Sequence, residues 1–397
     1  MGWIRLGDIA SKITKGTTPT SAGFHFTDTG VNFVKVESIS EDGNFIVDKF
    51  AHINNECNNK LGRSQLEEND ILFSIAGAIG RTAIVTKDIL PANTNQALAI
   101  IRIPNGIVDY SFLMYALKSP ALFSQYEKQK QGVAQINLSL QNVSDFRIPQ
   151  FSLDEQRKIA AVLDKVSFLI AKRRQQLDKL DELIKARFVE MFGDLADPAC
   201  KHIRCKLGET CKDSDDIKCG PFGTQLSKTE YQEQGVAVWE IPQINREFKE
   251  QPIHFVTNEK AKQLISYSLI PGDIAMSRKG NVGRCALFPK DFAPGIIHSD
   301  VLRIRVDKNK VNPCFLMYQL HFSKAVAHQI EMVSSGAVMA GINVTKLKQI
   351  YVHIPAFGLQ NQFAAFVEQT EKTKTTINKS LEKLETLKKA LMQEYFG

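Results

Sequence analysis

The sequence predicts an α+β protein built as a pseudo-twofold tandem repeat, in which two homologous α/β modules are separated by two long antiparallel coiled-coil helices. Three observations predict this fold: segments that recur at a nearly constant offset, short apolar runs in each half, and a long helical period after each module. The predicted domains are residues 1–150 (first module), 151–196 (central helix), 197–355 (second module) and 356–397 (C-terminal helix).

The repeat is the strongest of these observations. The segment Asp70-Ile-Leu-Phe-Ser-Ile-Ala-Gly-Ala-Ile-Gly-Arg81 returns 203 positions later as Asp273-Ile-Ala-Met-Ser-Arg-Lys-Gly-Asn-Val-Gly-Arg284, and Phe112-Leu-Met-Tyr-Ala-Leu117 returns at the same offset as Phe315-Leu-Met-Tyr-Gln-Leu320. Asn137 and Pro149 match Asn343 and Pro355 at an offset of 206. Because the order is kept across the chain, we expect two homologous halves whose small insertions lie in loops.

Each half begins with short runs rich in β-branched and aromatic residues. In the first half we expect strands at residues 32–39, 70–75, 82–86 and 97–103. A short helix is expected at residues 112–119.

A helical period begins after Pro149 and again after Pro355. The first helix, from about residue 154 to 191, has a coiled-coil stripe with one charged position, at Leu163, Val166, Ile170, Arg173, Leu177, Leu180 and Ile184. The second has a stripe at Phe363, Phe366, Thr370, Thr373, Ile377, Ser380, Leu384, Leu387 and Leu391. Each helix spans roughly 55 to 60 Å at 1.5 Å per residue, more than a module of this size covers. We therefore expect the two helices to pair with each other, and not only with their own modules.

The composition is that of a globular protein with two or three cores. The chain has 397 residues, of which 43% are hydrophobic, and a net charge of +7 that permits a polyanionic partner. Seven cysteines without regular spacing favour a reducing compartment. The first ten residues contain no apolar signal segment, and no run of about 18 apolar residues occurs, so we expect a cytoplasmic protein with no membrane span.

The sequence lacks the residue patterns of an enzyme. Asn312-Pro-Cys-Phe315 is close to the Asn-Pro-Pro-Phe motif of amino-methyltransferases but lacks its second proline, and no glycine-rich cofactor loop follows a strand. It is expected to begin a short helix. The segment 74–80 has no Gly-Lys-Ser/Thr and is expected to be a strand and a hairpin turn. One cluster of cysteines and a histidine suggests zinc, but the absence of a Cys-x-x-Cys pair argues against that site. The cluster is Cys200, His202, Cys205, Cys211 and Cys219. We predict no catalysis and no resident cofactor or metal.

Two different modules that alternate with two similar helices resemble the specificity subunit of type I restriction-modification systems, over essentially the whole chain. The supporting motifs are Lys15-Gly-Thr-Thr-Pro19, the turns Gly80-Arg81 and Gly283-Arg284, and the helix starts Leu153-Asp-Glu-Gln-Arg157 and Leu359-Gln-Asn-Gln-Phe363. The second module departs from the first motif with Lys218-Cys-Gly-Pro-Phe-Gly-Thr224, so loop contacts do not transfer residue by residue between the halves.

The resemblance implies two target-recognition domains, each reading half of a split, asymmetric DNA site, while the helices set the gap. It also implies docking of two adenine-N6 methyltransferase subunits and of restriction subunits. S-adenosylmethionine, ATP and Mg are then expected in those partners and not in this chain.

Polar or cationic residues on expected loops and strand ends are the candidates for DNA contact. They are Lys15, Thr17, Thr18, Lys35, Ser38, Arg81 and Gln135 in the first module, and Thr224, Gln225, Gln243, Asn245, Arg278, Lys279 and Arg284 in the second. Arg81 and Arg284 can instead pair with a local carboxylate. For Asn137 and Asn343 we favour a turn role, in which the side chain holds its own backbone.

An alternative function stays open at this point: a non-catalytic scaffold whose two modules bind proteins or RNA. A neighbouring gene for an adenine methyltransferase would favour the DNA reader over this scaffold.

Overall fold

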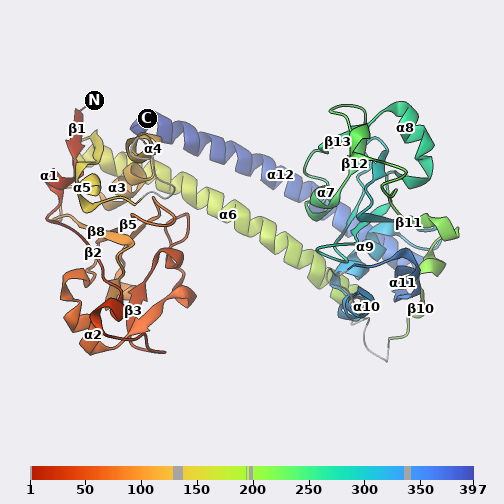
Figure 1. The fold of residues 1–397 in the computed structure, drawn as a ribbon, viewed down its shortest axis with the longest axis horizontal. Helices are drawn as coiled ribbons and strands as arrows, with labels where there is room; N and C mark the ends of the chain where they lie inside the picture. The colour runs from red at the N-terminus through yellow and green to blue at the C-terminus, as the bar shows by residue number, and fades with distance from the viewer. Residues whose placement is uncertain (1, 128–136, 194, 196–199, 335–340) are drawn as a thin grey trace. The chain divides into compact units, whose positions relative to one another are not determined.

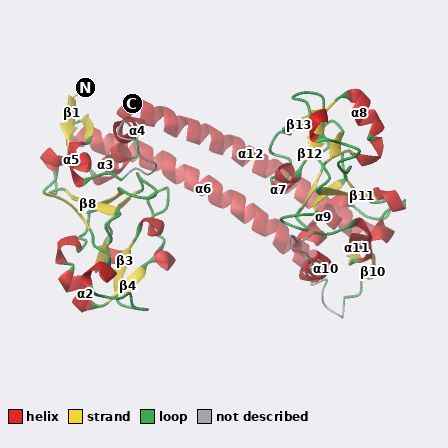
Figure 2. Cartoon of the chain, in the orientation of Figure 1, coloured by secondary structure: helices red, strands yellow, loops and turns green. Residues whose placement is uncertain are grey.

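The computed structural model describes residues 2–127, 137–193, 195, 200–334 and 341–397. The chain forms two compact units: Met1–Gln175 with Asn378–Gly397, and Gln176–Ile377. Unit 1 contains the first module and unit 2 the second (Figures 1 and 2).

Three sheets make up the first module. The antiparallel central sheet has the order β2 (Lys12–Lys15), β8 (Leu98–Arg102), β5 (Ile71–Ser74), β6 (Thr82–Ile84). The second sheet has the order β4 (Ala51–Ile53), β3 (Val31–Val34), β7 (Ala92–Thr94), and its β3–β7 pair is parallel. A two-stranded ribbon joins β1 (Gly2–Arg5) to β9 (Arg147–Gln150).

Short helices connect these strands. They are α1 (Leu6–Ile9), α2 (Asn55–Lys60), α3 (Tyr110–Leu117), α4 (Pro120–Glu127) and α5 (Leu140–Asp145), with 3-10 turns at Pro19–Ala22, Val36–Ser38, Val47–Lys49, Gly62–Ser64 and Lys87–Ile89. The helix expected at 112–119 is α3, which Asp109 caps by accepting a hydrogen bond from Phe112 N.

The second module repeats this plan. Its central sheet has the order β11 (Ile217–Cys219), β18 (Val301–Ile304), β15 (Ile274–Ser277), β16 (Cys285–Leu287). Its second sheet has the order β13 (His254–Val256), β12 (Val236–Trp239), β17 (Gly295–Ile297), β14 (Ser268–Leu269), again with a parallel β12–β17 pair. The ribbon pairs β10 (Ile203–Lys206) with β19 (Tyr351–Ile354).

The helices of the second module are α7 (Ile241–Asn245), α8 (Asn258–Gln263), α9 (Pro313–Phe322), α10 (Lys324–Ser334) and α11 (Val344–Gln349), with 3-10 turns at Leu207–Thr210, Ser214–Asp216, Lys228–Glu230 and Ile265–Tyr267. The methyltransferase-like motif does begin a helix, since Asn312 Oδ1 caps α9 through Cys314 N and Phe315 N.

The central sheet lies between two apolar layers. In β5, Ile71 and Phe73 face one core cluster, and Leu72 faces the other. The equivalent strand β15 divides Ile274 and Met276 from Ala275 in the same way. Both strands are therefore buried along their whole length, which explains why each is apolar up to its final serine.

The two long helices have the expected extent, α6 (Leu153–Phe192) and α12 (Phe357–Phe396). In unit 1, Arg174 pairs with Glu385 at 2.8 Å, and the start of α6 shares a core with Phe396. In unit 2, Asp181 pairs with Lys374 at 2.8 Å, and Phe188 and Phe192 pack on Phe363. Within each unit residue numbers rise along one helix as they fall along the other, so the helices pair antiparallel.

The stripe predicted on the second helix is wrong at two positions. Thr373 is exposed and Lys374 is buried in its place, and Leu387 is 46% exposed. Lys374 Nζ lies 2.8 Å from both Asp181 Oδ1 and Glu371 Oε1. Burial lowers the pKa of Lys374, but these two hydrogen bonds outweigh burial and leave the pKa above its ordinary value. A buried lysine is stable here because its charge is paired.

Other sequence-based expectations need smaller corrections. The strand expected at 32–39 ends at Val34, and a 3-10 turn follows at Val36–Ser38. Asn343 caps α11 through Lys346 N, as the turn role required, but its structural equivalent in the first module is Ser139, the cap of α5, and not Asn137. Among the described residues, no helix has the length and apolar character needed to cross a membrane.

Candidate nucleic-acid interface

The loops of the first module converge at one edge of its two main sheets. The pairs Lys15–Ala99 and Ser74–Leu98 place the ends of β2 and β5 beside the start of β8. The parallel β3–β7 pair ends at the same place, because residues 95–97 join β7 directly to β8. We call the residues that follow β2, β3, β5 and β7 (16–23, 35, 75–80 and 95–97) the strand-end surface of this module.

The second module builds an equivalent surface. The pairs Cys219–Leu302 and Ser277–Val301 align the corresponding strand ends. The parallel pair Trp239–Ile297 places residue 240 beside residue 298. The strand-end surface of this module therefore comprises residues 220–227, 240, 278–283 and 298–300.

A glycine fixes the first loop at the same point in both surfaces. A Cβ atom on Gly16 would lie 1.8 Å from Thr94 O, and one on Gly220 would lie 2.2 Å from His298 O. Both contacts are with backbone, so no side chain fits at either position. The loops after β2 and β11 therefore both begin with a glycine packed against backbone, and they differ after that glycine.

In the first module the strand-end surface is formed by neutral side chains and one cation. Thr18 Oγ1 donates to Gln96 Oε1 at 2.5 Å, which joins the loop after β2 to the loop after β7. Lys35 Nζ lies 4.6 Å from the ring centroid of Phe26. Of the predicted contacts, Thr17, Thr18 and Lys35 belong here, and Lys15 is the last residue of β2 before it; each is partly exposed.

The surface of the second module has more charged groups. The Arg278 guanidinium donates to Cys219 Sγ at 3.0 Å and to Ser299 O at 3.3 Å, and lies over Phe222. Burial raises the pKa of the Cys219 thiol. Within the described chain Arg278 Nε is buried without a hydrogen-bond partner. Lys279 Nζ pairs with Asp300 Oδ1 at 2.9 Å.

A chain of polar groups continues across this surface from Asp300. His298 Nδ1 accepts the backbone N–H of Asp300 at 3.2 Å, and His298 Nε2 lies 3.9 Å from Glu240 Oε1. Glu240 Oε2 lies 2.8 Å from His254 Nδ1, and the ring of Tyr231 stacks on His254. The chemistry of the two surfaces therefore differs although their backbones correspond.

The two turn arginines have local partners. Arg81 donates to the carbonyl oxygens of Val36 and Ile39 at 3.3 and 3.0 Å, so it fixes the turn after Lys35. Arg284 lies 2.8 Å from His321 Nε2 and 3.4 Å from Glu247 Oε1. Partial burial and the Arg284 charge lower the pKa of His321. Arg284 therefore pairs with a local carboxylate, which was the alternative to DNA contact for both arginines. Arg81 instead donates to backbone oxygens, which the sequence did not predict.

The remaining predicted contacts divide by exposure. Ser38 and Gln243 are buried, and their side chains bond backbone at Lys49 O and Gln251 O. Both side chains therefore hold the backbone and are not part of the proposed DNA surface. Thr224 and Gln225 are exposed in the loop after β11, and Asn245 accepts from Ser277 Oγ at 3.4 Å. Gln135 lies outside the described residues.

Sequence reasoning missed several residues of the strand-end surfaces. They are Asn95 and Gln96 in the first module and Glu240, His298 and Asp300 in the second. Glu240 occupies the position equivalent to Lys35, at an offset of 205, whereas the offset of 203 found in the sequence leads from Lys35 to Val238.

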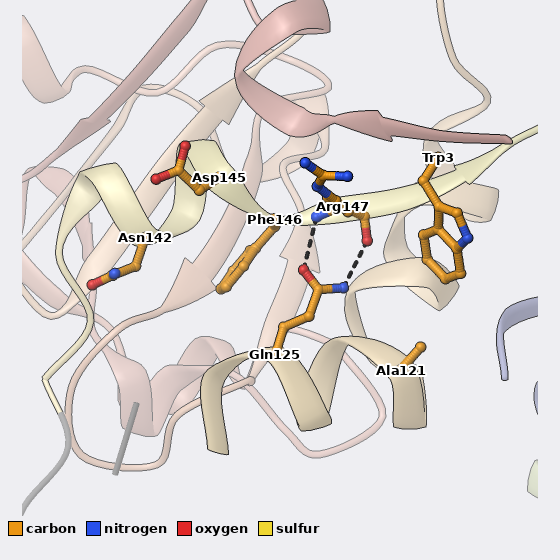
Figure 3. A pocket seen from close by; sticks show the side chains of 7 residues that line it. All are labelled: Trp3, Ala121, Gln125, Asn142, Asp145, Phe146 and Arg147. Carbon is orange, nitrogen blue, oxygen red and sulfur yellow. Dashed lines mark hydrogen bonds between the residues drawn. The ribbon is translucent and has the colours of Figure 1, made fainter. Parts of the chain in front are cut away.

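A separate hollow of about 520 Å³ lies beside the β1–β9 ribbon (Figure 3). Its lining is Trp3, Ala121, Gln125, Asn142, Asp145, Phe146 and Arg147. Gln125 donates to Arg147 O and accepts from Arg147 N, both at 2.8 Å. Gln329 makes the same pair of bonds to Tyr351, at 3.0 and 2.7 Å. This wall of the hollow therefore belongs to the repeated scaffold.

The cysteine cluster has no metal-site geometry. Cys211 is buried beside Thr210, and Cys205 and Cys219 lie on different strands, β10 and β11. In the part of the chain that the structure describes, no three His, Cys, Asp or Glu side chains gather as metal ligands.

Comparison with known proteins assigns the chain to a family. The family model for the type I restriction modification DNA specificity domain matches residues 2–181 and 220–388, once for each module with its helix. The chain belongs to this family. Type I specificity subunits are non-catalytic, and catalysis resides in the partner methyltransferase and restriction subunits.

Curated type I specificity subunits align with parts or all of the chain. The putative MjaX subunit of Methanocaldococcus jannaschii is 30% identical over 150 residues, and the EcoBI subunit of Escherichia coli is 33% identical over 132 residues. These alignments span 34% and 27% of the relatives and 36% and 33% of this chain. The MjaVIII subunit of M. jannaschii is 22% identical over 401 residues, which cover 98% of this chain and 90% of that subunit.

Solved type I structures share the fold. The S subunit from M. genitalium has a TM-score of 0.59 at 16% identity and covers 100% of this chain and 96% of its own. A chain solved in work on complex assembly and conformational transition of the type I R-M system has a TM-score of 0.58 at 17% identity, with 100% and 97% covered. Two domains joined by long helices are thus the architecture of the type I specificity subunit.

Proposed function

We propose that this type I specificity subunit reads a bipartite, asymmetric DNA site, with the strand-end surface of each module contacting one half. One observation carries the proposal: the two surfaces are built on corresponding strand ends, fixed at Gly16 and Gly220, but carry different loops and side chains. Loops on a rigid scaffold can vary in chemistry without a change of fold. Two such loops of unlike chemistry suit a DNA site whose two halves differ.

The proposed partners follow from the non-catalytic role. We propose that two methyltransferase subunits dock on the chain, one per repeat, and that restriction subunits join this complex in the cytoplasm. S-adenosylmethionine, ATP and Mg would then be bound by those partners. Because each unit offers an equivalent arrangement of module and paired helices, it supports one docking event per unit.

Methyl transfer tests this function directly. The purified full-length chain should transfer no labelled methyl group to DNA, and addition of the methyltransferase should restore transfer to a bipartite sequence. Replacing both Thr18 and Gln96 with alanine should alter the bases required in one half-site only. Replacing Arg278 and Lys279 should alter the other half-site only. Transfer by the isolated chain, or methylation without sequence preference, would contradict the proposal.

The docking proposal has its own measurement. Titration of the chain with methyltransferase, followed by mass determination of the complex, should reach two methyltransferase subunits per chain. A complex that stays one-to-one at saturating methyltransferase would argue against one docking surface per unit.

A further inference from the structure

One position of the strand-end surface has opposite charges in the two modules. Lys35 follows β3 and Glu240 follows β12, and each precedes a short helical turn. The backbone N–H of Lys35 donates to Ser38 Oγ at 3.3 Å, and that of Glu240 donates to Gln243 Oε1 at 3.2 Å. Their backbones are therefore held in the same way while their side chains carry a cation and an anion.

Both side chains keep capacity for a ligand. Within the described chain Lys35 forms no salt bridge, and its ammonium group lies over the face of Phe26. Glu240 Oε2 is bonded to His254, whereas Oε1 lies 3.9 Å from His298 Nε2, beyond direct hydrogen-bond distance. Lys35 can therefore donate, and Glu240 Oε1 can accept.

The opposite charges decide which part of DNA this position faces. A lysine alone fits either a phosphate or a base. A carboxylate beside a phosphate is repelled, so a position that bears Glu240 in one module is unsuited to the DNA backbone. If the equivalent scaffolds dock in the same way, the same position in the first module also faces base edges.

We propose that Lys35 and Glu240 are specificity-determining residues of the two half-sites, an inference that rests on the proposed DNA-reading function. Lys35 donates to the O6 and N7 acceptors of a guanine in the major groove. Glu240 accepts a hydrogen bond from the exocyclic amino group of cytosine or adenine. His254 holds Glu240 in position through its 2.8 Å contact and is a positioning residue.

The test uses the full-length chain in complex with its methyltransferase. The complex is presented with a duplex library whose two half-sites are randomised, and bound and methylated sequences are determined. Lys35→Gln should lower the preference for guanine at one position of one half-site by about 5- to 150-fold, the range that a good base contact provides. Glu240→Gln should lower the preference for cytosine or adenine by a similar factor in the other half-site.

Matched variants control for charge and for folding. Lys87→Gln and Asp291→Asn remove the same charges from exposed loops that follow β6 and β16, away from the strand-end surfaces, and should leave every base preference unchanged. Lys35→Arg keeps a donor and should keep guanine. If Glu240→Gln unfolds, the Lys35 variants decide, because the hydrogen bond at Lys35 uses only its backbone.

The possible outcomes separate this inference from the function on which it rests. A wild-type complex that selects no sequence refutes the proposed function. A wild-type complex that selects a bipartite site, with both glutamine variants keeping the same bases, overturns the specificity assignment alone. A uniform loss of affinity over all sequences in Lys35→Gln would show a phosphate contact and would also overturn it.

Discussion

The buried carboxylate of Asp70 accepts two hydrogen bonds from the guanidinium of Arg102, each 2.7 Å long. Asp273 and Arg305 form the same pair in the second module, at 2.8 and 2.7 Å. Each carboxylate also accepts a backbone N–H three residues earlier, from Glu67 or Ile270. The pair therefore connects the loop before β5 to the end of β8 in the first module, and the loop before β15 to the end of β18 in the second.

Asp70→Ala should lower the free energy of unfolding by about 1.5 to 3 kcal/mol, because it removes two charge-assisted hydrogen bonds from a buried site and leaves Arg102 with only the exposed carboxylate of Glu67 as an ionic partner. Chemical denaturation of the full chain measures this loss. Glu68→Ala, one exposed carboxylate nearby, should change the free energy by less than about 0.5 kcal/mol. Equal effects of the two variants would contradict the argument.

Gly16→Ala and Gly220→Ala should each destabilise the chain by about 1 to 3 kcal/mol, because the new methyl group overlaps a backbone oxygen. Each should also weaken DNA binding through the half-site of its own module. Denaturation and binding to half-site duplexes measure the two effects. Gly62→Ala and Gly358→Ala are the controls, since both glycines lie outside the strand-end surfaces and in the described structure a Cβ there meets no heavy atom within 4 Å.

Phe396→Ala and Phe192→Ala should weaken different units. Phe396 packs on Phe112 in unit 1 with ring centroids 5.2 Å apart, and Phe192 packs on Phe315 in unit 2 at 4.7 Å. Loss of such a buried ring costs about 3 to 5 kcal/mol. Hydrogen exchange should rise in α3 for the first variant and in α9 for the second. The same pattern of hydrogen exchange in both variants would refute the assignment of Phe396 to the core of unit 1 and of Phe192 to that of unit 2.

His321→Gln should reduce the acid sensitivity of the chain. The pKa of His321 is lowered in the folded state, so the unfolded chain binds its proton first as pH falls below about 6.5. The folded state of the wild type therefore loses stability below that pH, and glutamine removes this titration while keeping an acceptor for Arg284. Unfolding at pH 7.5 and 5 should show a smaller decrease for the variant. Parallel decreases would show that His321 does not contribute.

Local patterns in the sequence were sufficient for much of this structure. The period of the long helices predicted α6 and α12 to within a few residues, because a buried helical stripe must recur every three or four positions. The capping role of Asn343 followed from the short reach of its side chain. Lys15 and Arg278 were placed correctly at strand ends because short apolar runs and glycine-rich turns mark where β2 and β15 end.

Contacts between distant segments explain what the sequence missed. Lys374 is buried because Asp181, 193 positions away, neutralises it, so a stripe counted along one helix could not include it. Gln96 and Glu240 reach the strand-end surfaces through parallel strand pairs whose register no local pattern reveals. Arg81 was placed on the correct turn, but its direction depends on carbonyl groups at Val36 and Ile39.

The packing of Phe396 into the core of unit 1 sets an order in time for synthesis of the chain. At about 5 to 20 residues per second, a ribosome needs roughly 10 to 40 seconds to proceed from the end of α6 to Phe396. During that interval Phe112 lacks its cover from α12 and presents an apolar surface to chaperones. The first module to be translated is thus the last to be completed, after the second module has already been made.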